Sequence, residues 1–219
     1  MGDPGWPAGD TNRTGRWDRL DCSLNATSAV PIVRFCSHCG HPTSLRVPEG
    51  DNRTRACCDQ CGTIHYVNPR PVVGTIPVWG ERVLLCKRAI EPRYGKWTLP
   101  AGFMETGETT GDGALRETLE EAGARVDLGP LFTMIDVPHV QQVHIFFRAE
   151  LVDTAFAAGT ESLEVRLFSE HEIPWDEIAF RTVSATLRHF FADRKLGEYG
   201  IHVESIVAGV PVTSGSAPR

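Results

Sequence analysis

Alternating apolar and polar positions predict several strands in the middle and second half of the chain. Residues 72–88 read as two strands that meet at Gly80, which suits the turn of a hairpin. Residues 143–151 alternate cleanly, with apolar side chains at every second position, and residues 162–169 alternate in the same way. These segments are expected to contribute to a sheet.

A longer period predicts a helix near the C-terminus that packs on this sheet. Apolar side chains recur there at i, i+4, i+7 and i+8, at Val183, Leu187, Phe190 and Phe191. Strands and helices together indicate a mixed α/β domain, and 219 residues with 41% hydrophobic side chains can bury one good core. Residues 1–33 have no sustained period and predict a disordered tail, and the small, polar residues 206–219 predict a second tail.

A second helix is expected to end at Gly123, a suitable C-cap. It lies in an acidic stretch, residues 102–124, that reads GFMETGETTGDGALRETLEEAGA. The expected buried stripe of this helix consists of Ala114, Leu115, Leu119 and Ala122. The carboxylates Glu117, Glu120 and Glu121 then lie on the opposite side. Like charges at this spacing repel by a few tenths of a kcal/mol per pair, so the stretch is either a solvated acidic face or a site for hard divalent cations.

Cysteines gather near the N-terminus in a pattern typical of zinc binding. Five of the seven lie between residues 36 and 61, and two pairs have x2 spacing followed by glycine: Cys36 with Cys39, and Cys58 with Cys61. Four thiolates complete a closed tetrahedral shell, so residues 34–70 predict a zinc ribbon with a structural Zn²⁺. Cys57 could replace Cys58, but it would give x3 spacing, and Cys58 is favoured. The ribbon has no core of its own and is expected to pack on the larger domain or on a partner subunit.

Charge and hydropathy narrow the class of protein. The net charge is −6 and the pI is about 5.7, which makes nucleic-acid binding unlikely. No apolar run approaches the length that spans a bilayer, and the N-terminus lacks a hydrophobic signal core. We therefore expect a cytoplasmic protein with no membrane partner.

The acidic stretch resembles the Nudix box. Gly102, five residues, Glu108, seven residues, and then Arg116-Glu117-x-x-Glu120-Glu121-x-Gly123 match every fixed position of that motif. The resemblance implies a Nudix α/β/α sandwich with a mixed sheet over residues 71–205, and Mg²⁺- or Mn²⁺-dependent hydrolysis of a nucleoside diphosphate linked to another group. It implies that Glu117, Glu120, Glu121 and the carbonyl of Gly102 are metal ligands. Glu108 then braces the loop and its Arg116.

Two zinc-ribbon Nudix groups are considered for the substrate. The NADH pyrophosphatases carry an SQPWPFPxS array, where this chain reads FTMIDVPHVQQVHIFFRAEL (residues 132–151). Four other segments resemble the plant chloroplast-type enzymes and their bacterial relatives: residues 35–40, 68–77, 84–108 and 161–180. This resemblance implies that the small-molecule substrate is FAD or ADP-ribose, or both, with AMP released. The alternatives are an NADH or NAD pyrophosphatase, and a non-catalytic Nudix regulator that binds a nucleotide or nucleic acid. Homodimerisation is implied by the resemblance.

A further carboxylate outside the box is a natural base for the attacking water, because cations depress the pKa of carboxylates that bind them. In zinc-ribbon Nudix enzymes a Glu of similar context reaches the metal site, and it aligns with Glu161. The alternatives are that Glu164 serves, or that both are ordinary surface acids. Tyr94, Trp97 and Phe146 could stack on a substrate ring, although core packing is favoured for Trp97 and Phe146.

Overall fold

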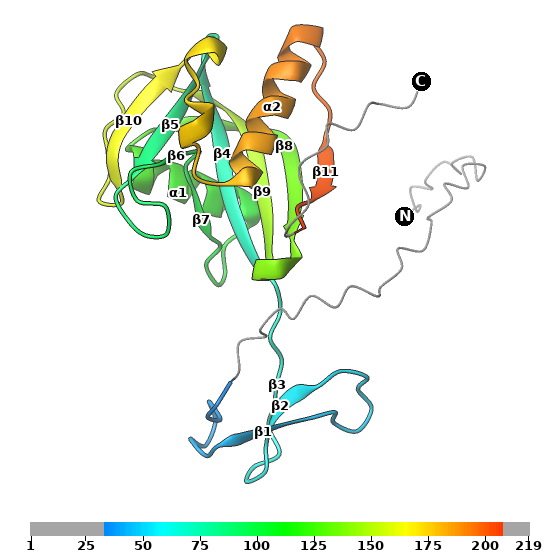
Figure 1. Cartoon of the computed structure of the whole chain (residues 1–219). Helices are drawn as coiled ribbons and strands as arrows, with labels where there is room; N and C mark the ends of the chain where they lie inside the picture. The colour runs from blue at the N-terminus through cyan, green and yellow to red at the C-terminus, as the bar shows by residue number, and fades with distance from the viewer. Residues whose placement is uncertain (1–32, 208–219) are drawn as a thin grey trace, which may run out of the picture.

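The computed structural model describes residues 33–207, which form a small ribbon and a larger domain (Figure 1). Nearly all of the expected N-terminal tail, residues 1–33, and most of the expected C-terminal tail, residues 206–219, lie outside the described part. Within that part, neither helix is long and apolar enough to cross a membrane.

The ribbon is a three-stranded antiparallel sheet in the order β1-β2-β3. Its strands are β1 (Thr43–Arg46), β2 (Arg55–Cys58) and β3 (Ile64–His65). They pair only with one another, and Figure 1 shows the ribbon apart from the larger domain, below the start of β4. The expected packing of the ribbon against the larger domain is therefore not seen in this structure.

The larger domain is built on an eight-stranded mixed sheet. Six strands run in the order β10-β5-β4-β9-β8-β11, while β6 pairs with β5 and β7 pairs with β4. The pairs β4–β9 and β8–β11 are parallel. The bounds are β4 (Arg70–Trp79), β5 (Arg82–Arg88), β6 (Trp97–Thr98), β7 (Ala101–Phe103), β8 (Val126–Val137), β9 (Gln142–Leu151), β10 (Ser162–Phe168) and β11 (His202–Ser205).

Two helices, α1 (Thr110–Ala122) and α2 (Arg181–Leu196), lie on opposite faces of this sheet (Figure 1). A capping box between Thr109 and Asp112 starts α1, and Gly123 ends it with φ of 57°, a left-handed conformation that glycine adopts without strain. Three short 3₁₀ turns complete the domain: η1 (Pro138–Val140), η2 (Glu170–Glu172) and η3 (Trp175–Glu177).

Alternation along β5 divides the core into two layers, as an α/β/α sandwich requires. Val83 and Leu85 pack with Leu187 of α2, whereas Leu84 and Cys86 pack in a separate cluster with Ala122, the last residue of α1, and Ala124. The α2 layer holds all four apolar residues that predicted this helix, together with Trp97 and Phe146. The α/β/α sandwich with a mixed sheet that was expected from the sequence is therefore confirmed.

The orientation predicted for α1 is wrong in part. Leu119, expected in the buried stripe, is 55% exposed, whereas Glu117 and Glu121 are only 9% and 6% exposed. The helix turns Thr118 inward instead, and its hydroxyl lies 2.6 Å from that of Thr75 on β4. Because Glu117 and Glu121 are one turn apart, the same rotation brings both carboxylates against the sheet.

The C-terminal boundary also lies later than the sequence predicts. Ile206, the first residue of the expected tail, is 5% exposed and packs with Ile135, Val137 and Ala185. Its amide donates to the carbonyl of Asp136 at 2.8 Å, which continues the parallel pairing of β11 with β8.

Candidate active site

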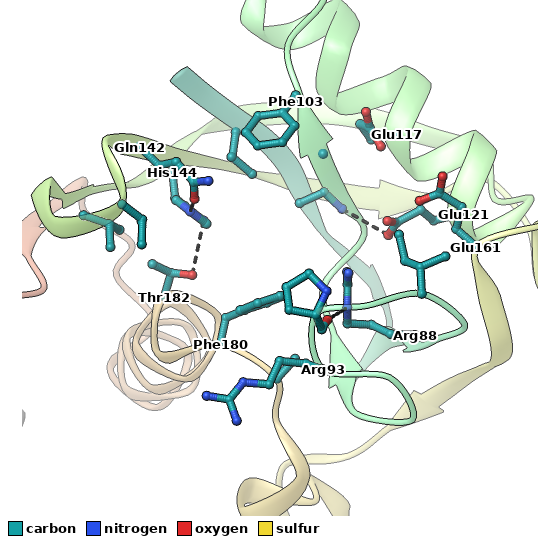
Figure 2. Close-up of a pocket in the computed structure, with 18 of the residues that line it drawn as sticks. Arg88, Arg93, Phe103, Glu117, Glu121, Gln142, His144, Glu161, Phe180 and Thr182 are labelled. Carbon is teal, nitrogen blue, oxygen red and sulfur yellow. Dashed lines mark hydrogen bonds between the residues drawn. The ribbon is translucent and has the colours of Figure 1, made fainter. Parts of the chain in front are cut away.

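A cavity of about 1060 Å³ lies between α1, β7, β9 and the start of α2. Figure 2 shows Glu117, Glu121 and Glu161 at one end and Gln142, His144 and Thr182 at the other. Phe103, Phe180 and Arg88 lie between these ends. The cavity therefore joins an acidic end to an end where the side chains of Gln142, His144 and Thr182 are polar and uncharged, and Arg93 and Arg181 also line it.

Arg116 ties the loop before α1 to the helix. Its Nε and Nη2 donate to the two carboxylate oxygens of Glu108 at 3.0 and 2.8 Å, a bidentate pair. Glu108 also accepts from the amide of Glu105 at 2.6 Å. The Arg116 guanidinium, followed by this amide, lowers the pKa of Glu108 to about 2. The role expected for Glu108, bracing the loop and Arg116, is matched by this geometry.

The same guanidinium holds two of the crowded carboxylates. Its Nη1 donates to Glu117 at 2.7 Å and to Glu120 at 3.0 Å, and its Nη2 donates to the carbonyl of Phe103 at 3.1 Å. The positive charge of Arg116 thus offsets the repulsion among the carboxylates of α1. Arg116 is itself held by Glu108 and by the carbonyl of Phe103.

Glycine at position 102 lets Glu117 lie directly against β7. A Cβ at Gly102 would be 2.4 Å from both carboxylate oxygens of Glu117, a separation that real side chains do not tolerate. The carboxylate and the backbone of β7 are therefore close enough to present oxygens to one region, although α1 and β7 are separate elements.

Glu121 lies deepest among the acidic residues. Its carboxylate accepts from the amide of Ala101 at 3.3 Å. Burial is the main cause that raises its pKa to about 8, and the charge of Glu117 adds to this rise. Burial also raises the pKa of Glu117 itself. A buried group of carboxylates that resists ionisation gains from a bound cation, and oxygen ligands of this kind suit Mg²⁺ or Mn²⁺.

Glu161 reaches the cavity through a loop fastened to the end of α1. The amide of Gly159 donates to the carbonyl of Glu121 at 3.0 Å, and the Glu161 carbonyl accepts from the amide of Ala89 at 2.8 Å. Glu161 lines the cavity, whereas Glu164 does not and instead lies opposite Lys87 in the β10–β5 register. Of the two acids considered as a base, the structure brings only Glu161 to the site.

Several residues at the far end of the cavity were missed by sequence reasoning. Phe103 and Phe180 line it, and Tyr94, a ring considered for stacking, does not. His144 is the third residue of β9, its polar neighbour Gln142 is the first residue of the same strand, and its other polar neighbour, Thr182, belongs to α2. The polar side of the alternating strand 143–151 could have marked His144, but nothing in the sequence joins it to Thr182.

The four predicted zinc ligands come together in the ribbon. The sulfur atoms of Cys36, Cys39, Cys58 and Cys61 all lie within 4.8 Å of one another, an arrangement found for no other such group in the described residues. Cys57 is also buried, but its thiol lies 3.7 Å from the carbonyl of Arg55 and is not part of the cluster. Four gathered thiolates match a structural Zn²⁺, because this ion takes four sulfur ligands in a closed shell.

Family comparisons agree with the two parts of the structure. The family described as NUDIX domain matches residues 68–191, and the zinc-ribbon family described as Nudix N-terminal matches residues 34–67. A crystal structure of a NUDIX hydrolase from Nitrosomonas europaea is 53% identical, with a TM-score of 0.78, and the match covers 80% of this chain and 99% of that one.

Other relatives are more distant. The NAD-capped RNA hydrolase NudC of Pseudomonas aeruginosa strain PAO1 is 28% identical over 73% of this chain, and the match spans only 57% of that protein's own length. The ADP-ribose pyrophosphatase of Streptococcus suis is 16% identical, with a TM-score of 0.51 over 64% of this chain and 100% of that one. This last likeness shows the fold alone.

Zinc should depend on Cys58 and not on its neighbour. We expect about one Zn²⁺ per chain in the wild-type protein and in Cys57→Ser, and loss of the metal in Cys58→Ser, because only Cys58 belongs to the thiolate cluster. Metal analysis by mass spectrometry after gel filtration measures this directly. Loss of zinc from Cys57→Ser with retention in Cys58→Ser would show that the pairs are assigned wrongly.

Stability without added Mg²⁺ or Mn²⁺ should fall as the pH rises. The pKa of Glu121 is raised from 4.5 to about 8, so the stability gained by burying the neutral carboxyl is lost as the pH passes through the folded-state pKa. Thermal unfolding between pH ~6 and ~9 should show a falling Tm that Mn²⁺ restores. Glu121→Gln should flatten the fall, and Glu164→Gln, the matched control, should not. Equal slopes in both variants would refute this assignment.

Proposed function

The chain belongs to the Nudix family, and we propose that it hydrolyses the diphosphate bond of a dinucleotide of the NAD class, with AMP as one product. The choice of NAD over FAD or ADP-ribose corrects the emphasis drawn from the sequence. It is supported by the curated relatives, which are named NAD-capped RNA hydrolases. These relatives are matched over only part of their length, so their substrate is taken here as a proposal.

One structural observation carries the proposal of a dinucleotide substrate, which is the shape of the cavity, whereas the choice of NAD among dinucleotides rests on the named relatives. A single space of about 1060 Å³ connects the carboxylates of α1 to the aromatic and amide side chains beside β9. A dinucleotide has the same layout, since a charged diphosphate joins two ring-bearing halves. The acidic end suits the diphosphate with its cations, and the uncharged end suits one of the rings.

The acidic end contains the donors that a divalent cation needs. Glu117, Glu120, Glu121 and the carbonyl of Gly102 are hard oxygen ligands, and the missing side chain at Gly102 leaves room for them. Bound Mg²⁺ or Mn²⁺ would polarise the phosphorus–oxygen bond and make water more acidic. Arg116 already holds Glu117 and Glu120 and keeps them oriented toward the cavity.

Glu161 is the proposed general base. It stands at the end of a loop next to the carboxylates, and its main chain is held by Ala89. Cations depress the pKa of the box carboxylates that would bind them and make those carboxylates poor bases, whereas Glu161 lies outside the box and is not needed as a metal ligand. Arg88, which is 8% exposed and lines the same cavity, adds a fixed positive charge for the diphosphate oxygens.

A substrate panel tests the proposed function. Purified protein with Mn²⁺ should hydrolyse NAD⁺ or NADH with higher kcat/KM than FAD, ADP-ribose or a nucleoside triphosphate, and chelation should abolish turnover. An RNA with a 5′ NAD cap belongs in the same panel, because the curated relatives are named for it. Preference for FAD or ADP-ribose would return the assignment to the other zinc-ribbon group. Nucleotide binding with no turnover of any substrate would indicate a regulator.

The base should be separable from its neighbour by mutation. Removing a general base typically costs about 10²–10⁴-fold in rate, so Glu161→Gln should lower kcat by that order with little change in KM. Glu164→Gln is the matched control and should do less, because Glu164 does not line the cavity. Steady-state kinetics at fixed Mn²⁺ provides the measurement. Equal, mild effects of the two changes would move the base to Glu117.

A further inference from the structure

The uncharged end of the cavity is organised by a row of paired residues on three strands. Phe103 of β7 pairs with Val72 of β4, and Val72 pairs with His144 of β9. Residues that pair across neighbouring strands point to the same face of a sheet, and all three line the cavity. Phe103 and His144 thus lie on one floor, on either side of Val72.

A directional chain of hydrogen bonds fixes the polar edge of this floor. His144 Nδ1 lies 3.2 Å from the hydroxyl of Thr182, and its Nε2 lies 3.0 Å from the carboxamide oxygen of Gln142. Burial lowers the pKa of His144 to about 4, so the ring is neutral at pH 7 and carries one proton. Nε2 must donate that proton to the Gln142 oxygen, and Nδ1 therefore accepts from Thr182.

These hydrogen bonds leave one donor and one acceptor available for a ligand. The Gln142 oxygen is used by His144, so the amino group of Gln142, which lines the cavity, remains to donate. The Thr182 hydroxyl gives its proton to His144 and keeps a lone pair that can accept. The edge therefore offers one donor and one acceptor with no net charge.

Aromatic and apolar side chains complete a flat recess. Phe103 and Phe180 lie on different sides of the space in front of His144 (Figure 2). The wall behind is apolar, because Val137 and Ile206 pack in one cluster and both line the cavity. Aromatic rings stack favourably on flat π-systems, so the recess suits a planar ring, while Arg93 and Arg181 also line the cavity and bring positive charge to it.

We propose that this recess, formed by Phe103, Gln142, His144, Phe180 and Thr182, binds a planar heteroaromatic ring that carries an amino donor beside a hydrogen-bond acceptor. This inference rests on the proposed function and deepens it. The amino group of Gln142 recognises the acceptor, which is a ring nitrogen in adenine or the carboxamide oxygen in nicotinamide, and Thr182 recognises the amino donor. Two parts of an NAD-type substrate have this chemistry, namely adenine and the carboxamide of nicotinamide.

Binding of mononucleotides tests the recess without any turnover. AMP and nicotinamide mononucleotide are titrated into the full-length protein, without added Mg²⁺ or Mn²⁺, by calorimetry. Gln142→Glu keeps the shape of the side chain but replaces the donating amino group with an acceptor. It should weaken binding of one mononucleotide by about tenfold or more, because a ligand acceptor then faces another acceptor. The weakened ligand identifies the ring that the recess holds.

Gln141→Glu is the matched control, since it makes the same change at the adjacent residue, which does not line the cavity. It should bind both mononucleotides as the wild type does. The proposal is overturned if the wild type binds neither mononucleotide, or if Gln142→Glu and Gln141→Glu bind alike. Because no hydrolysis is involved, a failure of the proposed catalytic function would leave this test valid.

The two possible rings also predict different kinetics. If the recess holds nicotinamide, Gln142→Glu raises KM for NAD⁺ and leaves KM for ADP-ribose unchanged, because ADP-ribose lacks that ring. If it holds adenine, KM rises for both substrates, and the hypoxanthine analogue of NAD⁺, which lacks the amino group, is a poor substrate for the wild type. In both cases kcat changes little, since the contact is remote from the phosphorus atom. A fall in kcat with no change in KM would contradict a binding role.

Discussion

The site depends on one constraint, which is that several carboxylates must lie close together without forcing the helix away from the sheet. Arg116 meets this constraint through four partners, because its guanidinium contacts Glu108, Glu117, Glu120 and the carbonyl of Phe103. The bidentate contact with Glu108 fixes the plane of the guanidinium. The loop before α1, the helix and β7 are consequently held in one arrangement before any cation or substrate arrives.

The two ends of the cavity are connected through β7. Phe103 accepts from Arg116 with its carbonyl, while its side chain lies in the row that leads to His144. Gly102, the residue before it, leaves space for Glu117. A three-residue strand thus sets the position of the proposed metal-binding end relative to the proposed ring-binding end, which is what hydrolysis between two halves of a substrate requires.

The segment that differs from the NADH pyrophosphatase array forms part of the cavity wall. Residues 132–151 form the end of β8, the turn η1 and the whole of β9. Within this segment, His139, Val140, Gln142 and His144 line the uncharged end of the cavity. The segment therefore supplies part of the cavity wall, whereas the carboxylate end retains every fixed position of the box.

Patterns within short stretches of the sequence predicted the mixed α/β domain and the grouping of the cysteines, and the match of residues 102–124 to the Nudix box implied the α/β/α sandwich and the reaction class. Cysteine pairs with two residues between them, carboxylates one turn apart and a 3.6-residue apolar period are all properties of a short stretch. The face of α1 that meets the sheet was decided only by tertiary packing, since Thr118 found a buried partner in Thr75 and Leu119 was left exposed. The uncharged recess likewise joins residues from β7, β9 and α2, which are brought together by strand register and not by proximity in the chain. Local patterns therefore identify the cysteine pairs and the acidic helix, whereas long-range pairing of strands brings the residues of the recess together.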